Sequence, residues 1–534
     1  YNADADPTEH EEIWPMIVAS RRNYLFVGES IDPNDWQSNV TADQIYQRVI
    51  DGVHHEDGHI ILLHDAGGSS RKPTLDALPR IIETLQHEGY QFISLEQYLG
   101  MNKQTLMPEI NKGKAYYAMQ TNLWLAEMIY HVSDFLTALF LVFLALGMLR
   151  LIFMYVLMIR EKRAENRRNY APIDAATAPT VSIIVPGYNE EVNIVRTITT
   201  LKQQDYPNLH IYFVDDGSKD HTLERVHEAF DNDDTVTVLA KKNGGKASAL
   251  NYGIAACRSE YVVCIDADTQ LKNDAVSRLM KHFIADTEKR VGAVAGNVKV
   301  GNQRNMLTYW QAIEYTSSQN FDRMAYSNIN AVTVVPGAIG AFRKEVIEAV
   351  GGFTTDTLAE DCDLTMSINE HGYIIENENY AVALTEAPET LRQFVKQRIR
   401  WCFGVMQAFW KHRSSLFAPS KKGFGLWAMP NMLIFQYIIP TFSPLADVLM
   451  LIGLFTGNAL QIFFYYLIFL MIDASVSIMA YIFEGERLWV LLWVIPQRFF
   501  YRWIMYYVLF KSYLKAIKGE LQTWGVLKRT GHVG

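Results

Sequence analysis

The chain has few cysteines, no strong positive charge and no repeated segment. Its 534 residues include four cysteines, none in a Cys-x-x-Cys pair, which favours a reduced, cytosolic setting over disulfides or zinc. The net charge is −9, and no Lys/Arg-rich face with interleaved aromatic residues occurs, so nucleic acid is not an expected partner. The chain begins at Tyr1 without an initiating methionine or a signal peptide, and we expect that an N-terminal part is missing.

Hydrophobic residues are unevenly distributed along the chain. They make up 49% of it and charged residues 20%, which are ordinary averages. Residues 1–120 and 161–420 mix polar and apolar positions as water-soluble domains do, whereas residues 135–159 and 425–511 are apolar enough to lie in lipid. The sequence therefore predicts two or three domains, with membrane-embedded segments between and after them.

The N-terminal region has a strand–helix–strand pattern. "HIILLHDAGG" (His59–Gly68) predicts a buried strand that ends in a polar turn. "TLDALPRIIETLQHEGYQFISLEQYLG" predicts an amphipathic helix, a turn at Gly89 and a second strand at "QFISL". The histidines of "HHEDGH" (His54–His59) fit no metal-ligand spacing and are expected in a solvated loop.

At "IDPNDW" and "LLHD" this region resembles the closing third to half of a polysaccharide deacetylase barrel of the NodB type. The resemblance implies a partial (β/α) fold and places His64 at an active site. The Asp-Asp pair and the His-x-x-x-His pair that such deacetylases use for their metal do not occur upstream of Asp32. We therefore expect residues 1–120 to be either a truncated catalytic domain or a remnant of one.

A long apolar segment follows. Phe135–Ile159 is apolar except for Arg150 and is long enough to cross a bilayer, so a transmembrane helix is predicted over residues 125–160. The basic run "REKRAENRR" (Arg160–Arg168) predicts a cytoplasmic end there, which places residues 1–120 outside. Arg150 could snorkel to the interface or face a polar path between helices.

Residues 171–424 alternate between apolar strands and helices. "VSIIVP" is a continuous apolar strand, as expected in a parallel sheet that is covered on both faces. "LHIYFVDD", "VTVLA" and "YVVCIDAD" predict three more strands, with helices between them. This alternation predicts an open α/β sheet whose ligand site lies at the carboxyl ends of the strands.

Acidic residues stand at two of those strand ends. Asp215 and Asp216 end one strand, and Asp266 and Asp268 end another. Two aspartates one residue apart can offer oxygen ligands to Mg²⁺ or Mn²⁺, and such a metal neutralises the charge of a departing diphosphate. Lys246, in "NGGKA", precedes a predicted helix, where backbone N–H groups and a cation suit a phosphate.

Two later motifs supply an acid–base group and a binding surface. "AEDCDL" contains Glu360 and Asp361; a carboxylate here can deprotonate an acceptor hydroxyl, and both residues also suit the start of a helix. "QRIRW" places Gln397, Arg400 and Trp401 on one face of an amphipathic helix. The indole offers a flat face to a sugar ring and the guanidinium can meet phosphate, although an interfacial helix with tryptophan at the lipid headgroups has the same pattern.

In this order, "VDDGSKD", "DAD", "AED" and "QRIRW" resemble the D, D, D, QxxRW pattern of processive family 2 glycosyltransferases, such as cellulose, chitin, hyaluronan and poly-N-acetylglucosamine synthases. The resemblance covers residues 180–530. It implies a cytosolic α/β domain with the GT-A fold, inserted between transmembrane helices, together with a UDP-sugar donor and an inverting mechanism. Ala359 stands where the family usually has threonine, which leaves the position of the base in place.

The resemblance also implies a role for each motif residue. It makes Asp361 the catalytic base, with Glu360 beside it, and it assigns Mg²⁺ or Mn²⁺ to Asp266 and Asp268. The residues implied at the UDP donor are Pro186, Tyr188, Glu190, Asp215, Asp216, Lys246 and Asp266. The residues implied at the acceptor or the diphosphate are Gln397, Arg398, Arg400 and Trp401. "VVPGAIGAFR" (Val334–Arg343) matches the family's acceptor-side segment.

Residues 425–515 predict three or four further membrane crossings. The first part of this stretch carries Pro440 and Pro444 and forms either a tight hairpin or a single bent helix, and the basic tail 516–534 favours a cytosolic end. Charged residues at membrane depth should face protein or water, either to line a polysaccharide channel or to pair between helices. They are Asp447, Asp473, Arg498 and Arg502.

Together these features predict a multi-pass enzyme of the plasma membrane that polymerises a UDP-sugar and passes the product outward. A deacetylase-like domain on the outer side favours UDP-N-acetylglucosamine, since such a domain makes most sense with an N-acetylated product. Cellulose-like or hyaluronan-like products remain open, as does non-processive transfer of one sugar to a lipid carrier. The intact aspartates disfavour a non-catalytic export subunit. The expected partners are the UDP-sugar, the growing polysaccharide and the lipid bilayer.

Overall fold

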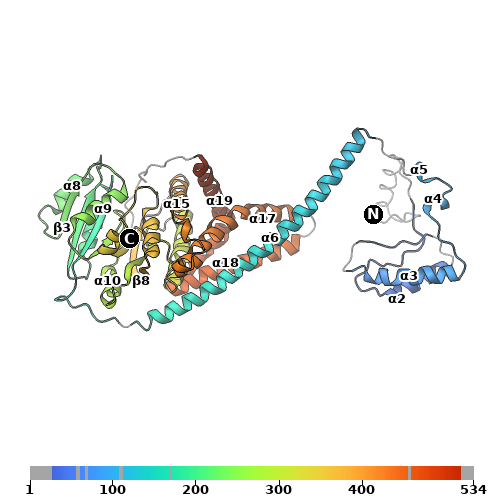
Figure 1. Ribbon diagram of the computed structural model, residues 1–534, viewed down its shortest axis with the longest axis horizontal. Coiled ribbons are helices and arrows are strands. Elements are labelled where there is room, and N and C mark those ends of the chain that lie inside the picture. The colour runs from blue at the N-terminus through green and yellow to red at the C-terminus, as the bar shows by residue number, and fades with distance from the viewer. Residues whose placement is uncertain are drawn as a thin grey trace. The chain divides into compact units, whose positions relative to one another are not determined.

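The computed structural model divides the chain into two compact units, Tyr1–Val132 and Ser133–Gly534 (Figure 1). Helix α6 (Lys114–Glu165) begins in the first unit and ends in the second. Each unit has a hydrophobic core of its own. The structure describes residues 27–55, 60–66, 70–106, 112–168, 170–454 and 459–518.

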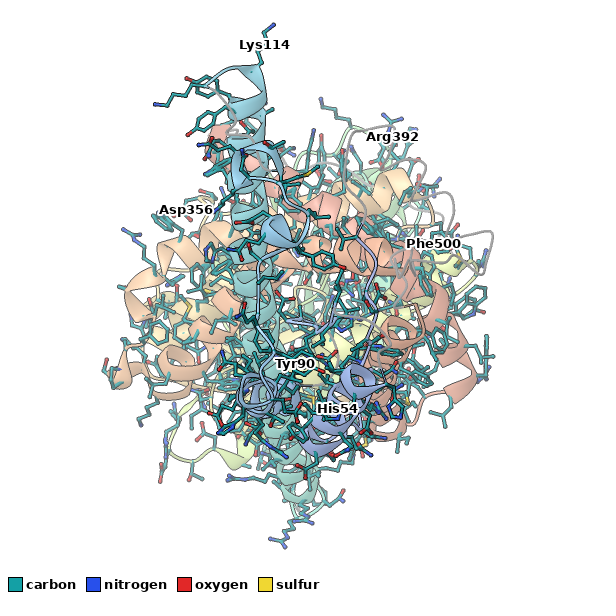
Figure 2. All side chains as sticks on the ribbon, turned by 90° about the vertical axis from the view of Figure 1, so that its right-hand side faces the viewer. His54, Tyr90, Lys114, Asp356, Arg392 and Phe500 are labelled. Atoms are coloured by element: carbon teal, nitrogen blue, oxygen red, sulfur yellow. The ribbon has the colours of Figure 1, made fainter. Side chains whose placement is uncertain are left out.

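The core of the first unit lies between two amphipathic helices, α2 (Ala42–His54) and α3 (Lys72–His87). Apolar residues recur along each helix at every third or fourth position, so that one stripe of each is buried. The buried positions include Ile45, Val49, Ile81 and Leu85. His54, labelled in Figure 2, ends α2 with its Nε2 atom 2.8 Å from the carboxylate of Glu88, just after α3. Two short helices follow, α4 (Leu95–Tyr98) and α5 (Lys103–Leu106).

The helix predicted in this region is confirmed by α3, but the strands predicted around it are not formed. The described part of His59–Gly68 contributes one isolated bridge, in which Ile61 pairs with Ile31. The second predicted strand, residues 91–95, is not formed either, since residues 91–94 have no regular structure and Leu95 begins α4. No extended strand lies beside either segment in the described part of this unit, and a lone strand would leave its backbone hydrogen-bonding groups unpaired.

Helix α6 contains the one segment in the described part of the chain that is long and apolar enough to cross a membrane, over Ala138–Glu165. This segment covers most of the predicted transmembrane helix. Met154 and Met158 are buried in the core of the second unit, and the hydroxyl of Tyr155 lies 3.1 Å from that of Ser475. One side of the helix therefore packs on protein, and its crossing of a membrane stays a prediction.

The second unit is built on an eight-stranded sheet with the order β3-β2-β1-β4-β7-β6-β8-β5. The four strands predicted from the sequence are confirmed and run parallel to one another: β1 (Val181–Gly187), β2 (Leu209–Asp215), β3 (Val236–Ala240) and β4 (Tyr261–Cys264). The helices between them are α7 (Ile194–Lys202), α8 (Thr222–Phe230) and α9 (Lys246–Ala256). Because β1 pairs with β2 on one side and β4 on the other, the strand order reverses there, which is where open α/β sheets bind ligands.

The other half of the sheet is mixed, a feature that the sequence pattern did not predict. Strand β7 (Gly340–Arg343) runs antiparallel to both β4 and β6 (Val291–Val300). Strand β8 (Ile374–Thr385) is parallel to β6, and the short β5 (Gln270–Leu271) is antiparallel to β8. The remaining elements before residue 390 are α10 (Ala275–Ala285), α11 (Met306–Glu314), the π-helix η1 (Tyr315–Asn320), α12 (Phe321–Ser327), α13 (Lys344–Ala349) and α14 (Glu360–Glu370).

Side chains of β1 alternate between two cores on opposite faces of the sheet. Val181, Ile183 and Val185 belong to one core, and Ile184 belongs to the other. All four side chains are fully buried. Burial on both faces explains why this strand reads as a continuous apolar run instead of an alternating one.

Helical segments follow one another directly from Phe424 to Leu454. They are η4 (Phe424–Ala428), α16 (Met429–Asn431), η5 (Met432–Ile438) and α17 (Ile439–Leu454). Earlier in the chain come α15 (Leu391–Lys411) and two short turns, η2 (Arg413–Ser415) and η3 (Pro419–Lys421). The predicted hairpin at Pro440–Pro444 is therefore wrong, and the alternative of one helical stretch holds. Pro440 comes directly after the π-helix η5, whose wider turn accommodates the proline ring.

Two further helices, α18 (Ala459–Glu484) and α19 (Val494–Lys518), follow with η6 (Leu488–Trp493) between them. The hydroxyl of Tyr506 donates to Asp447 at 2.9 Å, and the Nε atom of Arg502 lies 3.3 Å from the same carboxylate. These charged residues thus pair between α17 and α19, which is one of the two roles predicted for them. The side chain of Asp473 lies outside the described part of the chain.

Candidate active site

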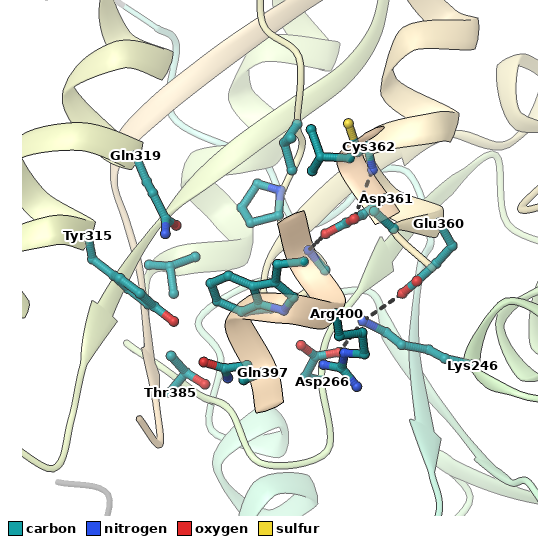
Figure 3. Close-up of a pocket in the computed structure, with 18 of the residues that line it drawn as sticks. Lys246, Asp266, Tyr315, Gln319, Glu360, Asp361, Cys362, Thr385, Gln397 and Arg400 are labelled. Carbon is teal, nitrogen blue, oxygen red and sulfur yellow. Dashed lines mark hydrogen bonds and ion pairs between the residues drawn. The ribbon is translucent and has the colours of Figure 1, made fainter. Parts of the chain in front are cut away.

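A pocket of about 370 Å³ lies at the carboxyl ends of β1 and β4 (Figure 3). The turn after β1, the loop after β4, the start of α9, the start of α14 and one face of α15 all contribute to its wall. The predicted site residues that line it are Pro186, Tyr188, Glu190, Lys246, Asp266, Asp268, Glu360, Asp361, Gln397, Arg400 and Trp401. Five segments that are far apart in the sequence therefore meet in one cavity.

Lys246, the first residue of α9, joins two of these motifs. Its ammonium lies 2.6 Å from Asp266 Oδ1 and 3.1 Å from Glu360 Oε1 (Figure 3). Burial opposes the positive charge, but the nearby carboxylates outweigh it, so the pKa of the Lys246 ammonium is raised above its usual range. The side chain therefore stays charged at any physiological pH and presents a cation to the pocket.

Asp361 lies in the first turn of α14 and accepts two backbone hydrogen bonds. The N–H of Cys362 donates to Oδ1 at 2.8 Å, and the N–H of Gly337 donates to Oδ2 at 3.2 Å. Burial, together with repulsion from Glu360, raises the pKa of the Asp361 carboxyl to about 6, even though Lys246 lowers it. A carboxylate with this pKa is ionised at neutral pH and can still accept a proton, as a general base requires.

The pocket wall is rich in carboxylates. Its lining holds seven Asp or Glu side chains against three Lys or Arg side chains. Such an excess of negative charge would repel a diphosphate unless a cation entered with it. Asp266 and Asp268 face the pocket one residue apart, and their oxygens are the ligands that Mg²⁺ and Mn²⁺ prefer. The donor set therefore fits a divalent cation.

No group of three or more His, Cys, Asp or Glu side chains in the described part of the chain is arranged to hold a metal ion by itself. A cation bound by Asp266 and Asp268 would have room for further oxygen ligands. The oxygens of a diphosphate are of the right kind, because Mg²⁺ is commonly held by one or two carboxylates together with substrate phosphates.

Asp215 and Asp216 do not line the pocket, and their carboxylates shape the loops beside it. Asp216 accepts the N–H of Gly245 at 2.7 Å and lies 2.7 Å from the ammonium of Lys241. These bonds hold the glycine turn that starts α9 and so place Lys246. Asp215 accepts backbone N–H groups two and three residues further along at 3.1 and 3.0 Å. The direct uridine contact implied for Asp216 stays a prediction.

Helix α15 carries the "QRIRW" motif along one wall of the pocket. Thr390 caps the start of this helix, and its hydroxyl accepts the N–H of Gln393 at 3.4 Å. Gln397, Arg400 and Trp401 line the pocket, as their spacing on one helix face predicted. Arg398 does not line it, because its side chain is buried on the other side of Trp401.

One group of pocket residues has no motif and was missed by sequence reasoning. The π-helix η1 and the following α12 contribute Tyr315, Ser318, Gln319, Asp322, Arg323 and Tyr326. A π-helix widens the helical turn and so changes which side chains share a face, and no spacing in the sequence signals that change. The six residues became visible as a set only in the folded chain.

Arg150 on α6 is held by side chains from two other helices, α12 and α16. Its Nη2 atom lies 2.9 Å from Asp322 Oδ2 on α12, and its Nε donates to Asn431 Oδ1 on α16 at 2.8 Å. Of the two roles predicted for Arg150, the polar contact between helices is the one observed. A lone arginine in an apolar run was the signal that a partner should exist.

His64, in the first unit, is bound to an aspartate that the sequence analysis did not single out. The Nδ1 atom of His64 lies 2.7 Å from Asp35 Oδ1, and its backbone N–H donates to Asp35 Oδ2 at 3.1 Å. Thr74 donates to the same carboxylate at 2.9 Å. Burial raises the pKa of the Asp35 carboxyl, but the hydrogen bonds from His64 and Thr74 outweigh it and leave the pKa lowered. The deacetylase resemblance of this unit stays a prediction.

Comparison with known proteins identifies the domain that holds the pocket. Residues 182–351 match the model of the family described as glycosyl transferase family 2. Residues 182–351 therefore form a family 2 glycosyltransferase domain, as the motifs within them predicted, and "AED" and "QRIRW" lie beyond the matched residues. The mixed sheet around the pocket is the GT-A-like fold of that domain.

Similar proteins include two poly-beta-1,6-N-acetyl-D-glucosamine synthases. The one from Staphylococcus epidermidis is 32% identical over 260 residues, which are 48% of this chain and 62% of the relative. The one from Staphylococcus aureus (strain COL) is 33% identical over 224 residues, 42% of this chain and 54% of the relative. The chain thus spans less than two thirds of the length of these relatives. A mannosyltransferase from Pyrobaculum calidifontis, solved in complex with GDP-Man and Mn2+, has a TM-score of 0.48 and 24% identity, over 67% of this chain and 98% of its own.

Proposed function

We propose that this protein is a processive, inverting glycosyltransferase that builds a β-linked polysaccharide from UDP-N-acetylglucosamine. The observation that carries the proposal is the meeting of four groups in one pocket: the Asp266–Asp268 pair, Lys246, Asp361 and Trp401. Together they offer a place for a metal and diphosphate, a base for the acceptor hydroxyl, and an apolar face for a sugar ring.

Asp361 is the general base of the proposed reaction. Its carboxylate takes the proton from the acceptor hydroxyl while that oxygen bonds to the anomeric carbon of the donor sugar and the bond to UDP breaks. The backbone N–H groups of Cys362 and Gly337 hold the two carboxylate oxygens and so orient it. Because base and leaving group lie on opposite sides of the sugar carbon, one displacement inverts its configuration.

The negative charge of the departing UDP is neutralised by cations in the wall of the pocket. Lys246 and Arg400 supply cations there, and both line the pocket. Asp266 and Asp268 would hold Mg²⁺ or Mn²⁺, which neutralises diphosphate charge when bound. Pro186, Tyr188 and Glu190, at the end of β1, line the same pocket and form the proposed nucleotide end. Trp401 offers its indole to the terminal sugar of the acceptor.

The choice of UDP-N-acetylglucosamine rests on the similar synthases and on the N-terminal region. The two staphylococcal relatives are named for a polymer of this sugar. The resemblance of residues 1–120 to a deacetylase suits an N-acetylated product as well. A panel of UDP-sugars tests this choice of donor.

The proposed enzyme sits in the plasma membrane and passes its polymer outward. Only 6% of the apolar part of Ala138–Glu165 is buried in protein, which suits a helix that faces lipid. The basic run Arg160–Arg168 favours a cytosolic side for the glycosyltransferase domain and an outer side for the N-terminal unit. Helices α17, α18 and α19 are the proposed further crossings, and three crossings would place the tail 516–534 on the outer side, against the cytosolic end that its basic residues favour.

Release of UDP by the purified full chain tests the proposal. The protein is supplied with Mg²⁺ or Mn²⁺ and with a panel of UDP-sugars, and the product is then sized and digested with linkage-specific glycosidases. A long polymer from UDP-N-acetylglucosamine is expected. Short products on a lipid carrier would contradict processivity, release from UDP-glucose alone would contradict the donor, and no release from any UDP-sugar would contradict the enzyme itself.

A further inference from the structure

Arg398 touches two residues of the pocket wall without lining the pocket itself. Its guanidinium carbon lies 4.3 Å from the centroid of the Trp401 ring, and its Nη1 donates to Gln397 Oε1 at 3.3 Å. The side chain is 2% exposed, so water does not compete for these contacts. Both Gln397 and Trp401 line the pocket.

A second layer of contacts holds Arg398 in place. Its Nη2 donates to Glu314 Oε2 at 2.6 Å, at the end of α11, and the hydroxyl of Tyr501 on α19 donates to the same oxygen. The ring centroid of Phe394, one turn earlier on α15, lies 4.9 Å from the guanidinium carbon of Arg398 and 5.2 Å from the ring centroid of Tyr501. The guanidinium is therefore fixed by elements from three parts of the chain.

These contacts constrain both pocket residues. An arginine only donates hydrogen bonds, so Gln397 must turn its carbonyl oxygen toward Arg398, which fixes the orientation of its amide. The indole of Trp401 has the guanidinium near one face, and the ring of Tyr315 lies 6.3 Å away at an interplanar angle of 36°. An indole held in this way has lost its freedom to rotate before a sugar arrives.

We infer that Arg398 is a positioning residue for the acceptor: it holds Trp401 and Gln397 in the geometry that receives the terminal sugar of the growing polymer. The inference rests on the proposed function and deepens it. Arg398 does not reach the donor nucleotide, because it lies outside the pocket wall. Its loss should therefore weaken acceptor binding and shorten the product while UDP binding stays intact.

Arg398→Lys is the sharpest variant. Lysine keeps the positive charge beside Glu314, but it has no planar group to lie over the indole and no second arm to reach Gln397. We expect the KM for an acceptor, a β-1,6-linked N-acetylglucosamine pentasaccharide, to rise about tenfold, and polymer length to fall. The affinity for UDP with Mg²⁺, measured by calorimetry, should stay within about twofold of the wild type.

Arg392→Lys is the matched control. Arg392 lies on the same helix, α15, and is exposed, as Figure 2 shows at the surface of the protein. The control should keep the wild-type acceptor KM and polymer length. If Arg398→Lys behaves like the control, or if it loses UDP affinity and acceptor affinity to the same extent, Arg398 is not a positioning residue.

Two more variants cover a failure of Arg398→Lys to fold. Glu314→Gln keeps the arginine but removes its anchor, and the pair Arg398→Met with Glu314→Gln removes both charges together and so leaves neither buried alone. Both should raise the acceptor KM with UDP affinity unchanged. If none of these variants folds while Arg392→Lys does, the role of Arg398 is structural and the inference is wrong. If the wild type releases no UDP at all, the proposed function itself has failed.

Discussion

Replacing Asp361 with asparagine should abolish transfer and at the same time stabilise the protein at neutral pH. Asparagine has nearly the same shape but cannot accept the proton of the acceptor hydroxyl. Loss of a positioned general base lowers the rate by about 10²–10⁴-fold. UDP affinity should change little, because the cations that meet the diphosphate, Lys246 and Arg400, are untouched.

The gain in stability follows from the raised pKa of Asp361. Burial and repulsion from Glu360 raise it from the usual 3.8 to about 6, so the folded protein binds this proton more tightly than the unfolded chain does. Ionisation of the carboxyl therefore lowers stability as the pH rises from about 4 to about 6, by about 3 kcal/mol once complete. Asparagine carries no charge and escapes this cost, although one backbone N–H group loses its acceptor for about 1 kcal/mol.

The net expectation for Asp361→Asn is a gain of about 2 kcal/mol at pH 7.5, and a smaller or vanishing gain at pH 5, where the wild-type carboxyl is mostly protonated. Thermal unfolding of both proteins at the two pH values measures this, and UDP release and calorimetry measure transfer and UDP binding. Elongation at close to the wild-type rate would refute the assignment of the base. A variant less stable than the wild type at pH 7.5 would refute the electrostatic argument.

Three further predictions concern other parts of the structure. Trp401→Ala should raise the acceptor KM about tenfold while UDP affinity stays constant, and equal losses of both would count against stacking on the sugar. Burial lowers the pKa of His412, but hydrogen bonds from its ring to Asp363 and Glu370 outweigh burial and raise the pKa to about 9. The charged ring therefore stabilises the fold fully below pH 6.5, and this stabilisation is lost as the pH rises through about 9. His412→Gln should therefore cost about 2–3 kcal/mol at pH 7, and the difference from the wild type should disappear at pH 10 in thermal unfolding. Arg150→Met should cost about 1–3 kcal/mol by leaving Asp322 without its cation, and the added change Asp322→Asn should restore most of it; additive losses would show that the pair is uncoupled.

Much of the second unit could be predicted because its signals are local. The four apolar runs became β1 to β4, and the acidic residues that follow them lie near the strand ends, as the general rule for open α/β sheets requires. Asp266 and Asp268 were placed correctly in the pocket wall for this reason. Helix periodicity likewise placed Gln397, Arg400 and Trp401 on one wall.

The errors have a common physical cause, which is dependence on distant partners. The segment at residues 91–94 has the composition of a strand, but no extended strand lies beside it in the described part of the first unit. Prolines at 440 and 444 suggested a hairpin, whereas a wide helical turn before them lets the helix continue. Arg398 belongs to a motif that faces the pocket, yet its position on the helix turns it toward Glu314.

The sequence by itself determined the resemblance to family 2 glycosyltransferases, the four strands of the parallel half of the sheet, and the chemical groups of the site. These depend on residue types and short spacings, which a linear chain displays directly. Only the tertiary structure decided that η1 and α12 complete the pocket, that Asp216 holds the turn before Lys246, and that Arg398 supports Trp401 from behind. Each of these depends on a contact between residues far apart in the chain, and such contacts exist only once burial has brought the elements together.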